Sequence, residues 1–229
     1  MAGTFEAERL REAVRSSLFA VSRLYRVRGD GDLQYDGKRP GEGWDAHGYF
    51  PRQLWMLDDG GLVCHRLWKQ RWLRREDGRT CHSRPPDDVR SLWSCALIVV
   101  LKLWALLDGT SGLHTSPEVL PGLEGHVSPR TTSRWLGRLG SRALALHQAI
   151  RRAVMERCEP RPIERLFPAG LSPPRGLACR RWRDPPSVAT LWRALAILLA
   201  GAVELSVPTA VLLAEARGRC GTPDTSSLF

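Results

Sequence analysis

Two long apolar segments place the strongest constraint on how this chain can fold, because each must be covered by protein or by lipid. They span residues 91–107 and 191–216. Lys102 interrupts the first, which is also shorter than the roughly 20 residues of a transmembrane helix. Arg193, Glu204 and Pro208 interrupt the second, and charged residues are costly inside a bilayer. The sequence therefore favours buried or amphipathic helices, and a membrane partner is the less favoured alternative.

The cysteines and the N-terminal sequence indicate the cellular compartment. Six cysteines are scattered along the chain, and no two form a Cys-x-x-Cys pair. The N-terminal sequence MAGTFEAERLREAVRSS mixes acidic residues with arginines and lacks the apolar core of a secretory signal. We therefore expect a protein of the reducing cytoplasm without a readable disulfide framework.

The charge is strongly basic and unevenly distributed. The formal net charge is +10 and the pI is about 10.0, which fits an acidic polymer or an anionic membrane surface as partner. Residues 130–183 contain thirteen arginines against three glutamates, so the rest of the chain is close to neutral. Arginine supplies 31 of the 34 basic residues, and its planar guanidinium suits phosphate and guanine. A GC-rich genome would also enrich arginine, so both explanations of the excess stay open.

Periodicity and turn residues predict four regions: 1–27, 28–86, 87–158 and 159–229. Apolar residues three to four apart predict an amphipathic helix from Thr4 to Val27. Glycines and aspartates predict loop and turn over residues 28–48. Two short runs around an Asp-Asp-Gly-Gly turn predict a β-hairpin between Tyr49 and Thr80.

The remaining patterns predict helices. A helix capped by Asp87 or Asp88 is expected to end at Leu107, and a short helix is expected at Pro117–Leu120. The proline-rich stretch 159–176 predicts a linker. Two further segments are expected to be helical: residues 187–199 and 207–216. These elements predict a mainly α fold with a small β-hairpin unit and a helix-turn-helix core.

The segment SPRTTSRWLGRLG, residues 128–140, is the candidate recognition helix. Ser128 as N-cap and Pro129 at the first helical position predict its start, and it is expected to continue to about Arg157 with a break at Gly137 or Gly140. Arginine can hydrogen-bond guanine in two places, and serine or threonine can hold phosphate. The candidate DNA contacts are Ser128, Arg130, Thr131, Ser133, Arg134 and Arg138. The alternative is an ordinary basic amphipathic helix whose polar face is solvated.

The hairpin supplies a second group of basic residues, which could hold backbone phosphates. They are Arg66, Lys69, Arg71, Arg74 and Arg75.

The stretch HGYFPRQLWMLDDGGLVCHRLWKQRWLRREDGRTCHSRPPD resembles the N-terminal zinc ribbon of transposases and transposon-associated proteins. In that family a strand with an hGyy.R motif precedes a cysteine knuckle, and the ribbon leads into a helical region with an S.rTv.RWl.rl recognition helix. Both halves occur here in that order, over roughly residues 33–146. The resemblance implies a DNA-targeting role related to mobile elements.

The zinc ligands of that family are replaced in this chain. Arg74 and Asp77 stand at the positions of one cysteine pair, and Tyr35 and Lys38 stand at those of the other. Arginine and lysine cannot ligate zinc, so we expect a metal-free ribbon stabilised by tryptophan packing. The tryptophans available are Trp44, Trp55, Trp68 and Trp72.

A relocated zinc site is the sharper alternative. It would use Cys64, His65, Cys81 and His82, with His47 as a further candidate ligand. Neighbouring strand residues point to opposite faces, so Cys64 and His65 are poorly placed to share one metal ion. We therefore expect no metal and no other cofactor.

No catalytic set is evident. The resembling transposases carry three separated carboxylates that hold two metal ions, and the acidic residues after Arg157 are few and scattered. The sequence thus predicts a non-enzymatic DNA-binding protein, with a homodimer left open. Two alternatives remain, which are a membrane-associated or partner-binding protein that uses the apolar C-terminal segment, and a decayed transposase remnant.

Overall fold

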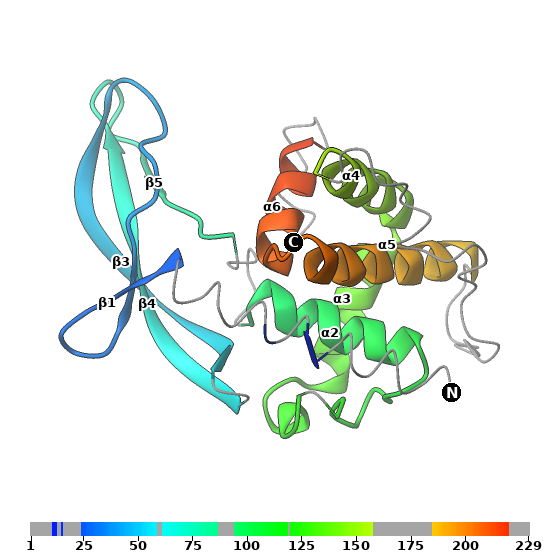
Figure 1. The fold of residues 1–229 in the computed structure, drawn as a ribbon. Coiled ribbons are helices and arrows are strands. Elements are labelled where there is room, and N and C mark those ends of the chain that lie inside the picture. The colour runs from blue at the N-terminus through cyan, green and yellow to red at the C-terminus, as the bar shows by residue number, and fades with distance from the viewer. Residues whose placement is uncertain are drawn as a thin grey trace.

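The computed structural model describes residues 11, 12, 15, 24–58, 61–86, 94–118, 120–157 and 185–219. It shows a long, curved β-sheet arm beside a cluster of helices (Figure 1). The described residues form five α-helices and a five-stranded mixed sheet, which is an α+β fold. The prediction of a mainly α fold with a small hairpin is therefore wrong.

The elements have the following bounds. The strands are β1 (Arg26–Val27), β2 (Leu33–Tyr35), β3 (Trp44–Asp58), β4 (Gly61–Arg74) and β5 (Thr80–His82). The helices are α2 (Ala96–Leu107), the 3-10 helix η1 (Leu123–Gly125), α3 (Pro129–Gly140), α4 (Ala143–Met155), α5 (Pro185–Glu204) and α6 (Thr209–Arg219).

Strand β4 is the centre of the sheet. It pairs with β3 in an antiparallel hairpin along almost its whole length, with β2 in parallel and with β5 in antiparallel orientation. The predicted hairpin is thus present, but it begins earlier than expected, at Trp44, and its second strand ends at Arg74. Strands β1 and β2 come from a region where the sequence predicts helix up to Val27 and loop afterwards. A tight turn closed by Arg28 N–H donating to the Asp32 carbonyl (2.8 Å), with Gly31 at φ +83°, turns the chain back.

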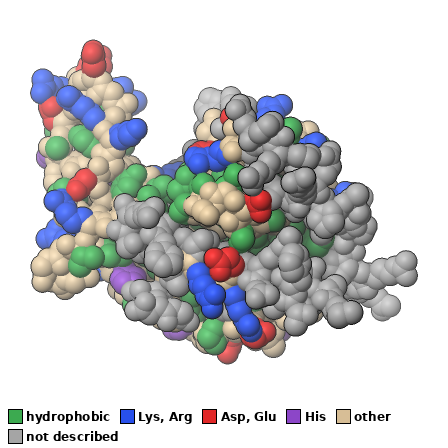
Figure 2. All heavy atoms as spheres, in the orientation of Figure 1, with side chains coloured by type: hydrophobic (Ala, Val, Ile, Leu, Met, Phe, Trp, Pro, Cys, Tyr) green, Lys and Arg blue, Asp and Glu red, His purple; other side chains and the backbone are tan. Residues whose placement is uncertain are grey.

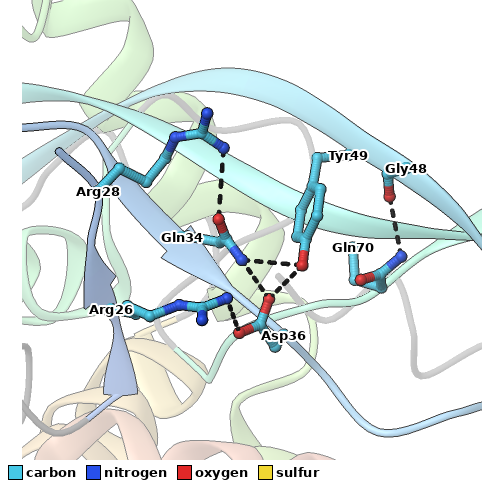
Figure 3. Close-up of polar contacts among 7 residues, drawn as sticks. All are labelled: Arg26, Arg28, Gln34, Asp36, Gly48, Tyr49 and Gln70. Atoms are coloured by element: carbon cyan, nitrogen blue, oxygen red, sulfur yellow. Dashed lines mark hydrogen bonds and ion pairs between the residues drawn. The ribbon is translucent and has the colours of Figure 1, made fainter. Parts of the chain in front are cut away.

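The outer strand β3 carries a bulge between Ala46 and Tyr49. Gly48 adopts φ +78° there, and the side-chain amide of Gln70 donates to its carbonyl oxygen at 2.9 Å (Figure 3). Pro51 lies in the same strand and presents no N–H at the open edge. The bulge and the proline both interrupt the outer edge of the sheet against further strand pairing.

Helix α2 lies at the centre of the helical part, and every residue except Leu106 is buried. It includes Lys102, whose ammonium group donates to the carbonyls of Gly112 (2.7 Å) and Thr115 and to the Ser111 hydroxyl. The buried charge is therefore satisfied by the loop that follows the helix.

Helix α2 begins later than predicted. Ser94 is bridged to Trp55 of β3, and Cys95 N–H donates to the Trp55 carbonyl at 2.9 Å. These contacts hold both residues in extended structure, so a continuous helix from Asp87 or Asp88 to Leu107 is wrong. Asp87 and Asp88 themselves lie outside the described residues.

The other helix predictions have mixed outcomes. The expected break after Gly140 is confirmed, and α5 and α6 confirm the two C-terminal helices. The short helix expected at Pro117–Leu120 is replaced by η1. Two further predictions lie outside the described residues. They are the linker at 159–176 and most of the helix expected between Thr4 and Val27.

A helix-turn-helix core is not formed as predicted. Such a motif joins its helices by a turn of about three or four residues. Residues 108–128 separate α2 from α3, and the short turn at Ser141–Arg142 instead joins α3 to α4. Within this connection, Ser111, Gly112 and Thr115 supply the acceptors for the Lys102 ammonium group, and η1 follows before α3 begins.

Candidate nucleic-acid interface

Helix α3 has one basic, exposed face and one buried face. Arg130, Arg134 and Arg138 follow each other at steps of four residues and are exposed, and Ser133 lies beside them. The opposite face packs into the core through Thr132, Trp135, Leu136 and Leu139. This division agrees with the one predicted from the sequence. We refer to Arg130, Ser133, Arg134 and Arg138 as the basic face of α3.

The start of α3 follows from local chemistry. The Ser128 hydroxyl accepts a hydrogen bond from Thr131 N–H at 3.2 Å, and the two side-chain hydroxyl oxygens lie 3.0 Å apart. Pro129 stands at the first helical position, where its missing N–H is not needed. Ser128 and Thr131 therefore form the cap of the helix. The remaining N–H groups and the helix dipole at this end favour an anion.

The three arginines of this face are free of internal partners within the described residues. None of them forms an ion pair or a hydrogen bond through its guanidinium group there. The tandem of α3 and α4, residues 129–157, contains seven arginines and one glutamate, a net charge of +6. The face is thus a row of guanidinium groups available to an external anion.

The basic residues of the hairpin are placed differently, because most are occupied inside the sheet. Arg75 pairs with Asp45, and Arg74 pairs with Asp77 through a 2.9 Å hydrogen bond and a second, shorter one. Arg66 stacks on the indole of Trp68, with its guanidinium carbon 4.7 Å from the ring centroid. Lys69 is buried at 8% exposure, and Arg71 is half-buried.

The arm of the molecule consequently shows mixed charge. Basic and acidic side chains are interspersed over the sheet in Figure 2. At its outer end Asp77 accepts hydrogen bonds from Arg74 and from the Arg79 backbone, and these bonds together with the arginine charges lower the pKa of Asp77 to about 2. The structure therefore separates the predicted contacts into an available set on α3 and a largely neutralised set on β4.

A further polar network holds the face of the sheet next to β2 (Figure 3). The Asp36 carboxylate accepts from the Gln34 amide (2.5 Å), the Tyr49 hydroxyl (2.6 Å) and Arg26 (2.7 Å). Burial by itself would raise the pKa of the Asp36 carboxyl group. The bonds from Tyr49 and Gln34 and the charge of Arg26 outweigh burial, so this pKa is lowered. The bond to Asp36 raises the pKa of Tyr49. This network fixes β1 and β2 to β3 and leaves Arg26 engaged.

Sequence reasoning missed the contribution of α4 to the exposed basic surface. Arg151 and Arg152 are exposed on this helix, which follows α3 after a two-residue turn. The helical periodicity of the sequence could have identified them, because it continues through this arginine-rich segment. Ala149, Ile150 and Ala153 form the buried side of α4, which leaves the two arginines on the exposed side.

The residues considered for a relocated zinc site are not brought together. Cys64 pairs with Trp55, and Cys81 pairs with Trp72 on β4. Cys64 and Trp72 are eight residue steps apart along β4, which corresponds to roughly 26 Å. His82 packs edge-on against Phe50 at 4.5 Å between ring centroids. Across the described ranges, no group of three or more His, Cys, Asp or Glu side chains is arranged to hold a metal ion.

The apolar C-terminal segment is part of the core. Ser187–Glu204 of α5 is the one helix in the described part of the chain that is long and apolar enough to cross a membrane. Within the fold its side chains Leu191, Trp192, Leu195 and Leu198 are buried, and the helix packs along α4 and against α2. A surface for lipid would require this helix to leave the core.

Comparison with known proteins adds no relative. No family model, no curated protein and no solved structure matches this chain. The resemblance to the targeting region of transposases therefore stays a prediction from short motifs.

Proposed function

We propose that this protein is a non-enzymatic DNA-binding protein that contacts duplex DNA through the basic face of α3. The observation that carries the proposal is the row of exposed guanidinium groups on α3, which no described carboxylate neutralises. Guanidinium groups bind phosphate oxygens and can bind the O6 and N7 atoms of guanine in a bidentate manner. The motifs shared with transposases support a related role in mobile-element targeting.

The rigidity of α3 supports the same proposal. Trp135, Leu136 and Leu139 fix one side of the helix in the core, and Ser128 caps its first turn. The arginines are thus presented from a fixed backbone, which reduces the entropy lost on binding. The net charge of +6 over residues 129–157 would also attract DNA over distances of about a Debye length.

The hairpin contributes less to this proposal than the sequence alone suggested. Arg74 and Arg75 would have to leave Asp77 and Asp45 before they could hold phosphates. We therefore assign base or phosphate contacts to Arg130, Arg134 and Arg138.

The test is fluorescence anisotropy of labelled duplex DNA over a salt series, with the full chain. Binding should weaken steeply with salt, and each phosphate contact contributes about 0.9 to the slope of log K against log salt. Arg134→Ala should weaken binding by about 1–3 kcal/mol, and Arg75→Ala should have little effect because Arg75 is paired with Asp45.

A loss of sequence preference in Arg134→Ala would assign base reading to that residue, and a uniform loss would assign phosphate contact. The proposal fails if the wild type does not bind duplex DNA, or if Arg134→Ala and Arg75→Ala weaken it equally. Anionic vesicles serve as competitor, and binding to vesicles alone would support the membrane alternative instead.

A further inference from the structure

A second cluster of basic side chains lies between α4 and α5. His147 is half-buried on α4, and Arg151 lies one turn further on the same side of this helix. Arg193 comes from α5, which packs against α4 along its length, and it is close enough to act electrostatically on His147. Two helices that are distant in sequence thus bring one imidazole and two guanidinium groups together.

Close packing fixes the relative position of these helices. A Cβ atom on Gly201 of α5 would lie 2.8 Å from a methyl carbon of Val154 on α4, so the Gly201 backbone packs against the Val154 side chain with no room for a methyl group. Val154 and Gly201 follow His147 and Arg193 along their respective helices. His147 precedes Val154 by seven residues and Arg193 precedes Gly201 by eight, about two helical turns in each case, which agrees with His147 and Arg193 lying at one level of this interface.

No described carboxylate neutralises this cluster. His147, Arg151 and Arg193 have no ion pair or hydrogen bond through their side chains within the described residues. Helix α6 also packs on α4, but its Glu215 pairs with Arg157 beyond the end of α4. Burial lowers the pKa of His147, and the charges of Arg151 and Arg193 lower it further. The empty site therefore disfavours the protonated imidazole, and its two fixed charges are both positive.

We propose that His147, Arg151 and Arg193 form a binding site for a phosphate group. The two guanidinium groups would donate hydrogen bonds to the phosphate oxygens. His147 would take up a proton from solvent when the anion arrives, because an adjacent negative charge favours the imidazolium form. This site uses α4 and α5 rather than the basic face of α3, so it does not depend on DNA binding by α3.

The test is an NMR titration of the His147 ring in the full chain, with the resonance assigned by its loss in His147→Gln. The titration is run in sodium chloride and in sodium phosphate at equal ionic strength. We expect the titration midpoint of His147 to rise by about half a pH unit or more in phosphate, a roughly threefold preference of the anion for the protonated site. The rise should disappear in Arg193→Gln and in Arg151→Gln.

Arg152→Gln is the matched control, because Arg152 is exposed on α4 next to Arg151 in sequence but is turned about 100° away around the helix. It should keep the phosphate-dependent rise, and so should Arg134→Ala, which separates this site from the proposed function. A titration with a short duplex distinguishes the source of the phosphate. A rise with inorganic phosphate indicates a free phosphate ligand, and a rise with duplex alone indicates backbone phosphate.

The proposal is overturned if neither phosphate nor duplex moves the midpoint of His147. It is also overturned if Arg193→Gln retains the full rise, because the anion would then be bound elsewhere.

Discussion

The imidazole ring of His126 packs on the indole of Trp55, with ring centroids 4.0 Å apart and planes inclined by 37°. Trp55 belongs to β3, and its backbone also receives Cys95 N–H at the start of α2. His126 lies two residues before Ser128, the cap of α3. This contact therefore joins the sheet, the central helix and the approach to the basic face of α3.

Replacing His126 tests how much its contact with Trp55 contributes to the stability of the fold. Aromatic pairs contribute about 0.5–1.5 kcal/mol, so His126→Ala should lower the free energy of unfolding by about 1 kcal/mol in urea denaturation. His114→Ala is the control, because His114 is exposed and should change stability by less than about 0.5 kcal/mol. Equal stability of the two variants would show that the ring contact contributes nothing.

Two helical glycines should respond to alanine in opposite directions. Gly137 has open space around its Cβ position, so Gly137→Ala should raise the free energy of unfolding by about 0.5–1 kcal/mol. Gly201→Ala should lower it, because the new methyl group meets Val154 at 2.8 Å and forces α5 away from α4. Chemical denaturation of both variants measures the two signs, and stabilisation by Gly201→Ala would contradict the close approach of the helices.

Two buried tryptophans differ in whether the indole N–H has a partner. Trp192 donates to Asp108 at 3.0 Å, whereas the Trp135 indole N–H has no partner among the described residues. Both phenylalanine variants lose ring atoms, but only Trp192→Phe also leaves a half-buried carboxylate without its donor. Trp192→Phe should cost about 1–2 kcal/mol more than Trp135→Phe in urea unfolding at neutral pH. A larger cost for Trp135→Phe would mean that the Asp108 bond is not formed in solution.

The outer end of the sheet should give a measurable acid dependence through Asp77. Hydrogen bonds from Arg74 are the main cause that lowers its pKa from 3.8 to about 2 in the folded state. The folded state therefore binds this proton more weakly than the unfolded chain. The carboxylate stabilises the fold above about pH 4, and this contribution is lost as the pH falls from about 4 to 2.

Comparison of the wild type with Asp77→Asn measures that contribution. Their unfolding free energies should differ at pH 5 and converge towards pH 2. In an Arg74→Gln background the same comparison should show a smaller pH dependence, because the main hydrogen-bond donor is gone. A difference that stays constant from pH 5 to 2 would contradict the lowered pKa.

The sequence predicted best where local chemistry decides the structure. Ser128 and Pro129 mark the start of α3, and the apolar spacing around Trp135 identifies its buried side, so the basic face could be foreseen. The break after Gly140 and the helices α5 and α6 follow from similar local signals.

The strands β1, β2 and β5 could not be predicted in this way, because they exist only through pairing with β4. Leu33 lies opposite Leu67 in the parallel pair, and its own surroundings in sequence are the glycines and aspartates of a loop. The occupation of Arg75 by Asp45 likewise depends on the register of β3 against β4, which joins residues 30 positions apart. The burial of Lys69 has the same origin, since it lies opposite Phe50 and Tyr35.

The central position of α2 has a consequence for the synthesis of the protein. Helices α5 and α6, which pack against α2, lie roughly 100 residues further along the chain, and a ribosome adds about 5–20 residues per second. For about 5–20 s α2, which is almost entirely buried in the fold, is thus made but lacks the cover of α5 and α6. During that interval Lys102 is the one charged residue within α2, and its charge makes the segment a poor substrate for insertion into a membrane.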